Sequence, residues 1–148
     1  MEKTAVIFIG IQASGKSTFY KTRLGELVHI NLDTLKTRHR EKLLLEQCIA
    51  DGASFCVDNT NPTREDRARY LAPAKEAGYR IVGYFFQSRV ADCVERNRTR
   101  DASAQVPSMA IAATSNKLQM PSVTEGFDEL YFVTQKNGDF SVEEWREM

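Results

Sequence analysis

Eight consecutive residues near the N-terminus carry the pattern of a phosphate-binding loop. Residues 10–17 are Gly-Ile-Gln-Ala-Ser-Gly-Lys-Ser, a full match to G-x-x-x-x-G-K-[ST]. Glycines in this pattern let the backbone curl so that N–H groups converge on phosphate oxygens, and the next helix directs its N-terminus at the same anion. In this chemistry Lys16 reaches the β- and γ-phosphates and the Ser17 hydroxyl is a Mg²⁺ ligand. A chance glycine turn is the weaker interpretation, because a strand pattern precedes the motif and helix signals follow it.

Two aspartates further along the chain follow short apolar segments. Asp33 opens a helical pattern, where local sequence slightly favours an N-cap, but a kinase would also need a carboxylate there as general base. Asp58 follows the apolar residues 55–57, as does an acid that organises Mg²⁺ and its waters. The alternative for Asp58 is an Asx-turn that leads into Asn61 and Pro62. Beside a phosphate-binding loop, the metal role is the favoured interpretation for Asp58.

Arginines form two further groups. Arg89, Arg96 and Arg100 fall along one stripe of a helix, whereas Arg98 points elsewhere. Such a stripe is either a solvated face or part of a lid that neutralises charge on a transferring phosphate, with the small polar residues 101–105 as its moving part. The second group, Arg64, Arg67 and Arg69, is either a solvated face or a contact to the phosphate acceptor.

These residues require a scaffold, and the apolar pattern predicts one in which strands and helices alternate. Continuous apolar runs with β-branched residues indicate buried parallel strands, with helices on both faces of an α/β sheet. Ligands of such folds bind beyond the carboxyl ends of the strands. The expected strands are 5–9, 28–31, 54–57, 80–86 and 129–134, and the expected helices are 15–24, 34–50, 64–77 with Thr63 as cap, 89–100 and 107–119. Asn137 and Gly138 indicate a turn.

Composition narrows the class of protein. The chain has 148 residues with equal numbers of acidic and basic side chains, 20 each, which fits one domain and weakens the case for a dedicated nucleic-acid binder. Cys48, Cys56 and Cys93 are widely spaced, so we expect free thiols in a reducing cytosol and no structural zinc site. Residues 5–11 are apolar apart from Gly10, but this run is too short for a signal peptide, and no segment has the length of a membrane-spanning helix.

Taken together, the motifs resemble the kinase domain of the polynucleotide 5′-hydroxyl kinases, including that of the bifunctional kinase–phosphatases. The resemblance covers nearly the whole chain. It is carried, in order, by Gly-Lys-Ser-Thr at 15–18, His-Ile-Asn-Leu-Asp-Thr-Leu at 29–35, Asp-Asn-Thr-Asn-Pro at 58–62, Arg-Ala-Arg-Tyr at 67–70, Arg-Asn-Arg-Thr-Arg at 96–100, Val-Pro at 106–107 and Glu-Gly-Phe at 125–127. The Asp-Asn-Thr-Asn-Pro segment is the most telling, because a generic P-loop protein has no reason to carry it.

The resemblance implies a fold and a set of roles. The fold is a P-loop NTPase three-layer sandwich with a five-stranded parallel sheet and a helical lid at about 96–107, in a single domain over residues 1–148. Asp33 takes the general-base position, with Lys16 and Arg100 as the other catalytic residues. The implied ligand contacts are Gly10, Ala13, Ser14, Gly15, Lys16, Ser17, Thr18, Arg96 and Arg100 for ATP, Ser17 and Asp58 for Mg²⁺, and Asp33, Lys36, Asn59 and Arg67 for the acceptor.

The implied activity is ATP-dependent phosphorylation of a hydroxyl, with the 5′-hydroxyl of DNA or RNA as the leading acceptor. One departure from the family pattern is Leu32, because the family usually has arginine between the asparagine and the general base; Lys36 is the residue expected to replace that acceptor contact. Leu32 and the neutral charge keep a small-molecule acceptor such as a sugar, nucleoside or antibiotic open. A nucleotide-binding switch without transfer activity is a third reading, which the carboxylates and lid arginines disfavour.

Overall fold

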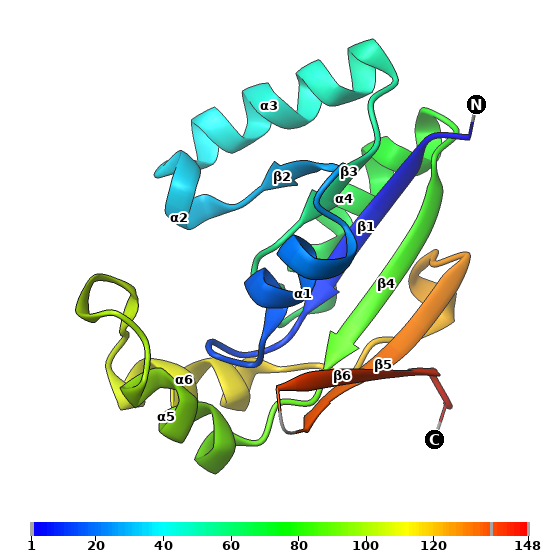
Figure 1. Cartoon of the computed structure of the whole chain (residues 1–148). Helices are drawn as coiled ribbons and strands as arrows, with labels where there is room; N and C mark the ends of the chain where they lie inside the picture. Colours follow the sequence, from blue (N-terminus) through cyan, green and yellow to red (C-terminus); the bar gives the residue numbers. More distant parts are fainter. Residues whose placement is uncertain (1, 137, 148) are drawn as a thin grey trace.

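The apolar run near the N-terminus forms the middle of the sheet. It is β1 (Thr4–Ile9), in which five of six residues are buried because helices cover both of its faces. The structure is a computed structural model that describes residues 2–136 and 138–147 (Figure 1). The remaining strands are β2 (Val28–Ile30), β3 (Phe55–Val57), β4 (Arg80–Phe86), β5 (Glu129–Lys136) and β6 (Asp139–Glu144), in the spatial order β2-β3-β1-β4-β5-β6.

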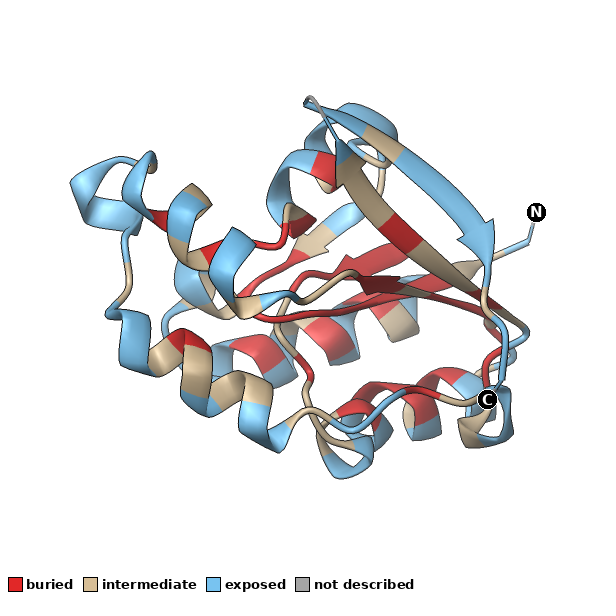
Figure 2. Cartoon of the chain, turned by 90° about the horizontal axis from the view of Figure 1, so that it is seen from below, coloured by how far each residue is buried: buried red, intermediate tan, exposed pale blue. Residues whose placement is uncertain are grey.

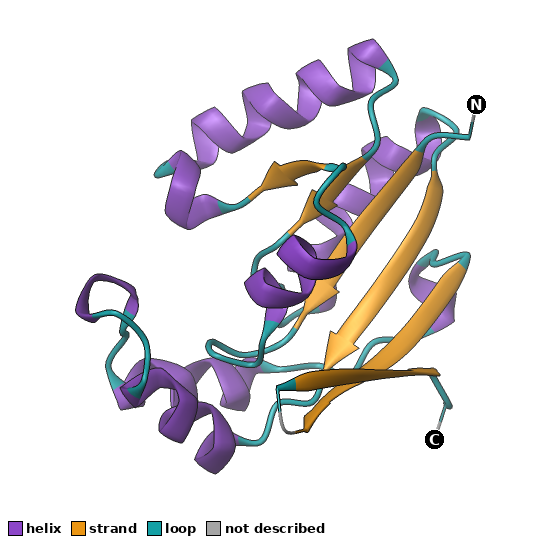
Figure 3. Cartoon of the chain, viewed as in Figure 1, coloured by secondary structure: helices purple, strands orange, loops and turns teal. Residues whose placement is uncertain are grey.

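Helices flank this sheet on both faces, as the alternation of elements predicts (Figure 3). Alternate residues of β1 enter two different apolar clusters, since successive strand side chains point to opposite faces. One cluster includes side chains of α3 and α4, and the other includes Phe19 of α1. Buried residues accordingly concentrate in the strands and on the inward sides of the helices (Figure 2). The helices are α1 (Lys16–Arg23), α2 (Leu32–Leu35), α3 (Arg38–Asp51), α4 (Arg64–Glu76), α5 (Val90–Arg98) and α6 (Ser108–Lys117), with 3-10 turns η1 (Ala102–Ala104) and η2 (Val123–Glu125).

The sheet differs from the expected one by a sixth strand. Strands β1 to β5 are parallel, but β6 pairs antiparallel with β5, from Lys136 opposite Asp139 to Tyr131 opposite Glu144. The expectation of five strands missed β6 because its sequence, Asp-Phe-Ser-Val-Glu-Glu, is mostly polar and exposed. The turn expected at Asn137 and Gly138 includes Asn137, which lies outside the described residues.

The single helix expected over residues 34–50 is in fact two. Helix α2 ends at Leu35, and Lys36 has a φ of 76°, which no helical residue adopts. Thr37 then caps α3 by accepting a hydrogen bond from the Arg40 amide. The cap of α2 is also not the one that local sequence favoured: Asn31 accepts from the Thr34 amide, and Asp33 lies inside the first turn. The side chain of Asp33 is therefore not needed as a cap.

Helix α4 begins as the sequence predicts. The Thr63 hydroxyl accepts from the Asp66 amide at 3.1 Å, and the Asp66 carboxylate in return accepts from the Thr63 amide at 3.3 Å. This reciprocal capping box satisfies two N–H groups that have no partner within the helix. It also fixes where α4 starts, directly after the loop that follows β3.

Removal of this cap should destabilise the protein. We expect Thr63→Ala to lower the free energy of unfolding by about 1 kcal/mol, because the Asp66 amide loses its acceptor. Urea denaturation measures the change. Thr22→Ala is a matched control, since that exposed hydroxyl bonds only to carbonyls of its own helix, α1. Equal stabilities of the two variants would contradict the role of the capping box.

Candidate active site

A cleft of about 730 Å³ lies at the carboxyl ends of the central strands. Residues that follow β1, β2 and β3 line it, and so do residues between α5 and α6. It collects most of the predicted site residues, together with several that were not predicted. Its lining residues are Gln12, Ala13, Gly15, Lys16, Ser17, Thr18, Asn31, Leu32, Asp33, Arg38, Asp58, Asn59, Thr60, Asn61, Pro62, Asp66, Arg96, Thr99, Arg100, Ala104, Val106, Thr114, Lys117 and Gln135.

The loop at residues 10–17 needs its two glycines for different reasons. A Cβ on Gly10 would lie 2.8 Å from Ser14 Oγ and 3.0 Å from Phe86 Cβ, so the loop packs too closely there for any side chain. Gly15 has a φ of 101° and serves as the N-cap of α1, a conformation that favours glycine. The loop thus delivers its backbone directly to the N-terminus of α1, the arrangement that binds phosphate groups.

Lys16 is held close to its own loop. Its Nζ atom donates to the carbonyl oxygens of Gly10 at 3.0 Å and Ile11 at 2.8 Å, and the residue is buried. Burial lowers the pKa of Lys16 from 10.5 to about 8, although the nearby Asp58 carboxylate opposes the shift. The side chain is therefore charged at neutral pH but loses its proton within a mildly alkaline range.

Asp58 joins the end of β3 to the phosphate-binding loop. Its Oδ2 atom accepts from Ser17 Oγ at 2.7 Å and lies 2.8 Å from Nε2 of His29, whose ring stacks on Tyr20. A hydroxyl and a carboxylate oxygen are the hard donors that Mg²⁺ prefers. The described residues contain no cluster of three or more His, Cys, Asp or Glu placed to hold a metal. The pair therefore fits an ion that completes its coordination with phosphates and water.

Asp33, in α2, is one of the residues that line the cleft. Both neighbouring amides are held: Leu32 N donates to Asn59 Oδ1 at 3.0 Å, and Thr34 N donates to Asn31 Oδ1 at 3.1 Å. The carboxylate is exposed, so it is accessible to an acceptor. Asn59 also lines the cleft, but its amide group is used in contacts within the protein.

The lining of the cleft includes Arg38 but not Lys36. Arg38 lines the cleft, whereas Lys36, with its positive φ at the break between α2 and α3, is not among the lining residues. Sequence reasoning missed Arg38 because it placed both residues on one continuous helix. It also assigned no role to His29, although a polar side chain within the apolar strand β2 was a usable signal.

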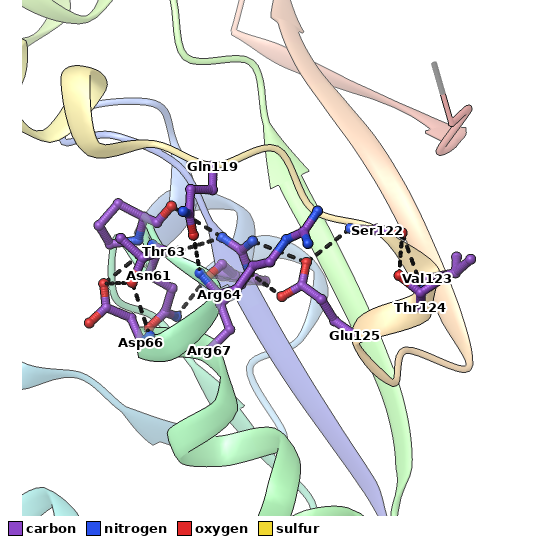
Figure 4. A network of polar contacts seen from close by, with 12 residues as sticks. Asn61, Thr63, Arg64, Asp66, Arg67, Gln119, Ser122, Val123, Thr124 and Glu125 are labelled. Carbon is purple, nitrogen blue, oxygen red and sulfur yellow. Dashed lines mark hydrogen bonds and ion pairs between the residues drawn. The ribbon is translucent and has the colours of Figure 1, made fainter.

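The structure corrects the prediction for Arg67. This residue is fully buried and forms two parallel hydrogen bonds to Glu125, Nε to Oε1 at 2.8 Å and Nη2 to Oε2 at 3.0 Å (Figure 4). Its Nη1 donates to the carbonyl oxygens of Asn61 and Pro62. Arg67 thus joins α4 to the turn η2, and this buried residue is not among those that line the cleft.

The arginines of the predicted stripe differ in where their side chains lie. Arg96 and Arg100 line the cleft, and Arg96 donates to the Ala13 carbonyl of the phosphate-binding loop at 2.9 Å. Arg98 points into solvent and pairs with Glu95, and Arg89 is not among the lining residues. The buried Asn97 side chain bonds both the N–H and the C=O of Val106, which closes the base of the exposed loop between them.

A substitution of Arg67 tests whether this residue stabilises the fold or contacts the acceptor. We expect Arg67→Ala to lower the free energy of unfolding by about 3–5 kcal/mol, because Glu125 is left as an unpaired buried charge. Arg98→Ala, at an exposed ion pair, should change stability little. Urea denaturation distinguishes the two. If Arg67→Ala were as stable as the unmodified protein, the structural role would be wrong and the original prediction of an acceptor contact would stand again.

Nucleotide binding should weaken as pH rises through 8. Lys16 is protonated below its lowered pKa and neutral above it, and only the charged form attracts phosphates. We expect ATP affinity to be about tenfold lower at pH 9 than at pH 7, as the protonated fraction falls. Isothermal titration calorimetry measures it. The Lys16→Ala variant should bind weakly with little pH dependence, and an identical decline in that variant would exclude Lys16 as its cause.

Comparison with known proteins shows which family the sequence matches and which proteins it resembles. The family described as "AAA domain" matches residues 6–121. A bifunctional polynucleotide phosphatase/kinase of Schizosaccharomyces pombe is 29% identical over 150 residues, covering 96% of this chain and 37% of the relative. A relative from Acanthamoeba polyphaga mimivirus, named for the same two activities, is 30% identical over 141 residues, covering 90% of this chain and 34% of the relative. The chain therefore spans about a third of the length of these relatives.

Solved structures share the fold at low identity. A gluconokinase from Sinorhizobium meliloti superposes with a TM-score of 0.61 at 16% identity, covering 88% of this chain and 82% of that one. Kti12 of Chaetomium thermophilum, in complex with ADP-AlF3, gives 0.63 at 15% identity and covers 88% of each chain. Within the described residues, none of the helices has the length and apolar character needed to cross a membrane. From its phosphate-binding loop, its fold and the family match, the chain belongs to the AAA domain family as a P-loop kinase domain.

Proposed function

We propose that this domain transfers the γ-phosphate of ATP to the 5′-hydroxyl of DNA or RNA. The observation that carries the proposal is that one cleft is lined by Lys16, by the hydrogen-bonded pair Ser17 and Asp58, and by an exposed carboxylate, Asp33. The first three residues suit the donor phosphates, and the fourth suits a hydroxyl that must lose a proton. Arg96 of α5 and Arg100, two residues after the end of this helix, also line the cleft.

The proposed transfer is an in-line displacement. The acceptor oxygen forms a bond to the γ-phosphorus while the bond from that phosphorus to the β–γ bridging oxygen breaks, and ADP leaves. Asp33 orients the hydroxyl and takes its proton. Lys16 and Arg100 stabilise the negative charge on the transferring group, and Arg96, in α5, supports them through its hydrogen bond to the Ala13 carbonyl of the phosphate-binding loop. Ser17 and Asp58 would hold Mg²⁺, which supplies charge neutralisation at the phosphates when bound.

A nucleic-acid acceptor is supported by two observations. The curated relatives are named for polynucleotide kinase activity and match most of this chain. Arg38 lines the acceptor side of the cleft and offers a guanidinium to a phosphodiester, as arginines do in many phosphate sites. A small-molecule acceptor is the second candidate, because the apolar Leu32 lines the cleft beside Asp33. The gluconokinase similarity contributes only the fold to that alternative.

The proposal predicts a specific labelling pattern. With Mg²⁺ and γ-labelled ATP, a 5′-hydroxyl oligonucleotide should acquire label, and the same oligonucleotide already 5′-phosphorylated should not. We expect Asp33→Asn to lower the transfer rate by about 10²- to 10⁴-fold, because the proton acceptor is lost. ATP affinity, measured by calorimetry, should remain close to that of the unmodified protein.

Control experiments distinguish an error in the proposed acceptor from an error in the proposed general base. Asp51→Asn, at the exposed end of α3, should leave the transfer rate unchanged. Full activity of Asp33→Asn would refute its assignment as general base. No label on either oligonucleotide, with ATP binding intact, would refute the nucleic-acid acceptor and direct the search to small hydroxyl compounds. Steep salt dependence of the acceptor KM would support a nucleic acid, because phosphate contacts release counterions.

A further inference from the structure

A buried carboxylate that the proposed mechanism does not use lies behind the acceptor side of the cleft. Glu41, in α3, has a side chain that is 2% exposed. One oxygen accepts from Arg38 Nη1 at 2.9 Å, and the other accepts from the Tyr70 hydroxyl at 2.9 Å and from Asn59 Nδ2 at 2.8 Å. A buried charge is costly unless it is fully hydrogen-bonded, and here both oxygens have partners.

Asn59, which lines the cleft together with Arg38, is the member of this cluster that contacts α2. Its Nδ2 donates to Glu41 and also to the Tyr70 hydroxyl, at 3.1 Å, so both amide hydrogens are used. Its Oδ1 is thereby turned towards α2, where it accepts from the Leu32 amide at 3.0 Å. Burial, reinforced by the charge of Glu41, raises the pKa of Tyr70, which keeps the hydroxyl protonated as a donor.

The Leu32 amide matters because it precedes Asp33. Helix α2 has four residues, too few to be stable by its own hydrogen bonds. External contacts must therefore hold its first turn. Asn59 binds the amide before Asp33 and Asn31 binds the amide after it, while Asn31 Nδ2 also donates to the Asp58 carbonyl at 2.6 Å. The backbone on either side of Asp33 is fixed by two asparagine side chains.

We propose that Asn59, oriented by Glu41 and Tyr70, is a positioning residue that holds Asp33 in line with the acceptor hydroxyl. This inference rests on the proposed function, because it assigns Asp33 the role of general base. It replaces the acceptor contact expected for Asn59 with a contact to the protein backbone. The positioning role also explains why polar side chains are buried here, since stability alone does not require a polar cluster where apolar side chains of the same size could pack.

The first test is independent of any substrate. Amide hydrogen exchange, followed by NMR, should show that Asn59→Ala increases exchange at the Leu32 amide by about tenfold or more, because the acceptor is lost. Exchange in β1 and β4 should remain unchanged. Unchanged protection at Leu32 would overturn the proposed contact, whether or not the protein phosphorylates an oligonucleotide.

The second test couples Asn59 to Asp33 through a double-mutant cycle. At saturating ATP we expect Asn59→Ala to lower the transfer rate by about tenfold to a hundredfold, since small displacements of a reacting group are costly. ATP affinity and the Mg²⁺ dependence should stay the same. In the Asp33→Asn background the same substitution should cost less than about threefold, because its effect acts through the missing carboxylate.

Matched tyrosine variants control for the loss of a buried hydroxyl. Tyr70→Phe removes one support of Asn59 and should lower the rate by a smaller factor than Asn59→Ala. Tyr79→Phe removes a hydroxyl that bonds the Cys48 and Ala53 carbonyls, away from the cleft, and should leave the rate unchanged. Equal losses from Asn59→Ala with and without Asp33 would overturn the positioning role. If the unmodified protein labels no oligonucleotide, the proposed acceptor fails, while the exchange experiment still decides the contact at Leu32.

Discussion

The shared hydrogen bonding of Asp58 is the interaction on which the site's geometry depends. One carboxylate oxygen accepts from Ser17 at the start of α1 and lies within hydrogen-bonding distance of His29 in β2. The Asp58 backbone bonds the Ile30 carbonyl and the Asn31 side chain. A single buried residue thus sets the relative positions of the phosphate-binding loop, the end of β3 and the turn that carries Asp33. A shift of Asp58 would displace both the donor and acceptor sides of the cleft.

Features encoded by neighbouring residues could be predicted from the sequence. The phosphate-binding loop, the limits of β4 and the capping box at Thr63 each depend on a few adjacent positions with a defined pattern. The grouping of Lys16, Ser17 and Asp58 was also accessible, because the carboxyl ends of parallel strands meet at one edge of a sheet. The family resemblance added Asp33, for which local sequence slightly favoured a cap.

Features that depend on distant partners could not be read in this way. Arg67 was predicted to contact the acceptor, because nothing near it in the sequence reveals its partner, Glu125, which is 58 residues away in the chain. Lys36 was predicted to contact the acceptor, because nothing in the sequence marks the positive φ that separates α2 from α3. Asn59 presented a similar difficulty: an amide beside a cleft suggests a ligand contact until its buried partners are known.

The antiparallel strand β6 has a consequence for the sheet as a whole. A parallel sheet ending at β5 would expose a long apolar edge, which is a template for pairing with other chains. Strand β6 covers that edge with a mostly exposed segment that carries Asp139, Glu143 and Glu144. The opposite edge, β2, is only three residues long. Both edges of the described sheet therefore resist intermolecular strand addition, one through charge and the other through its shortness.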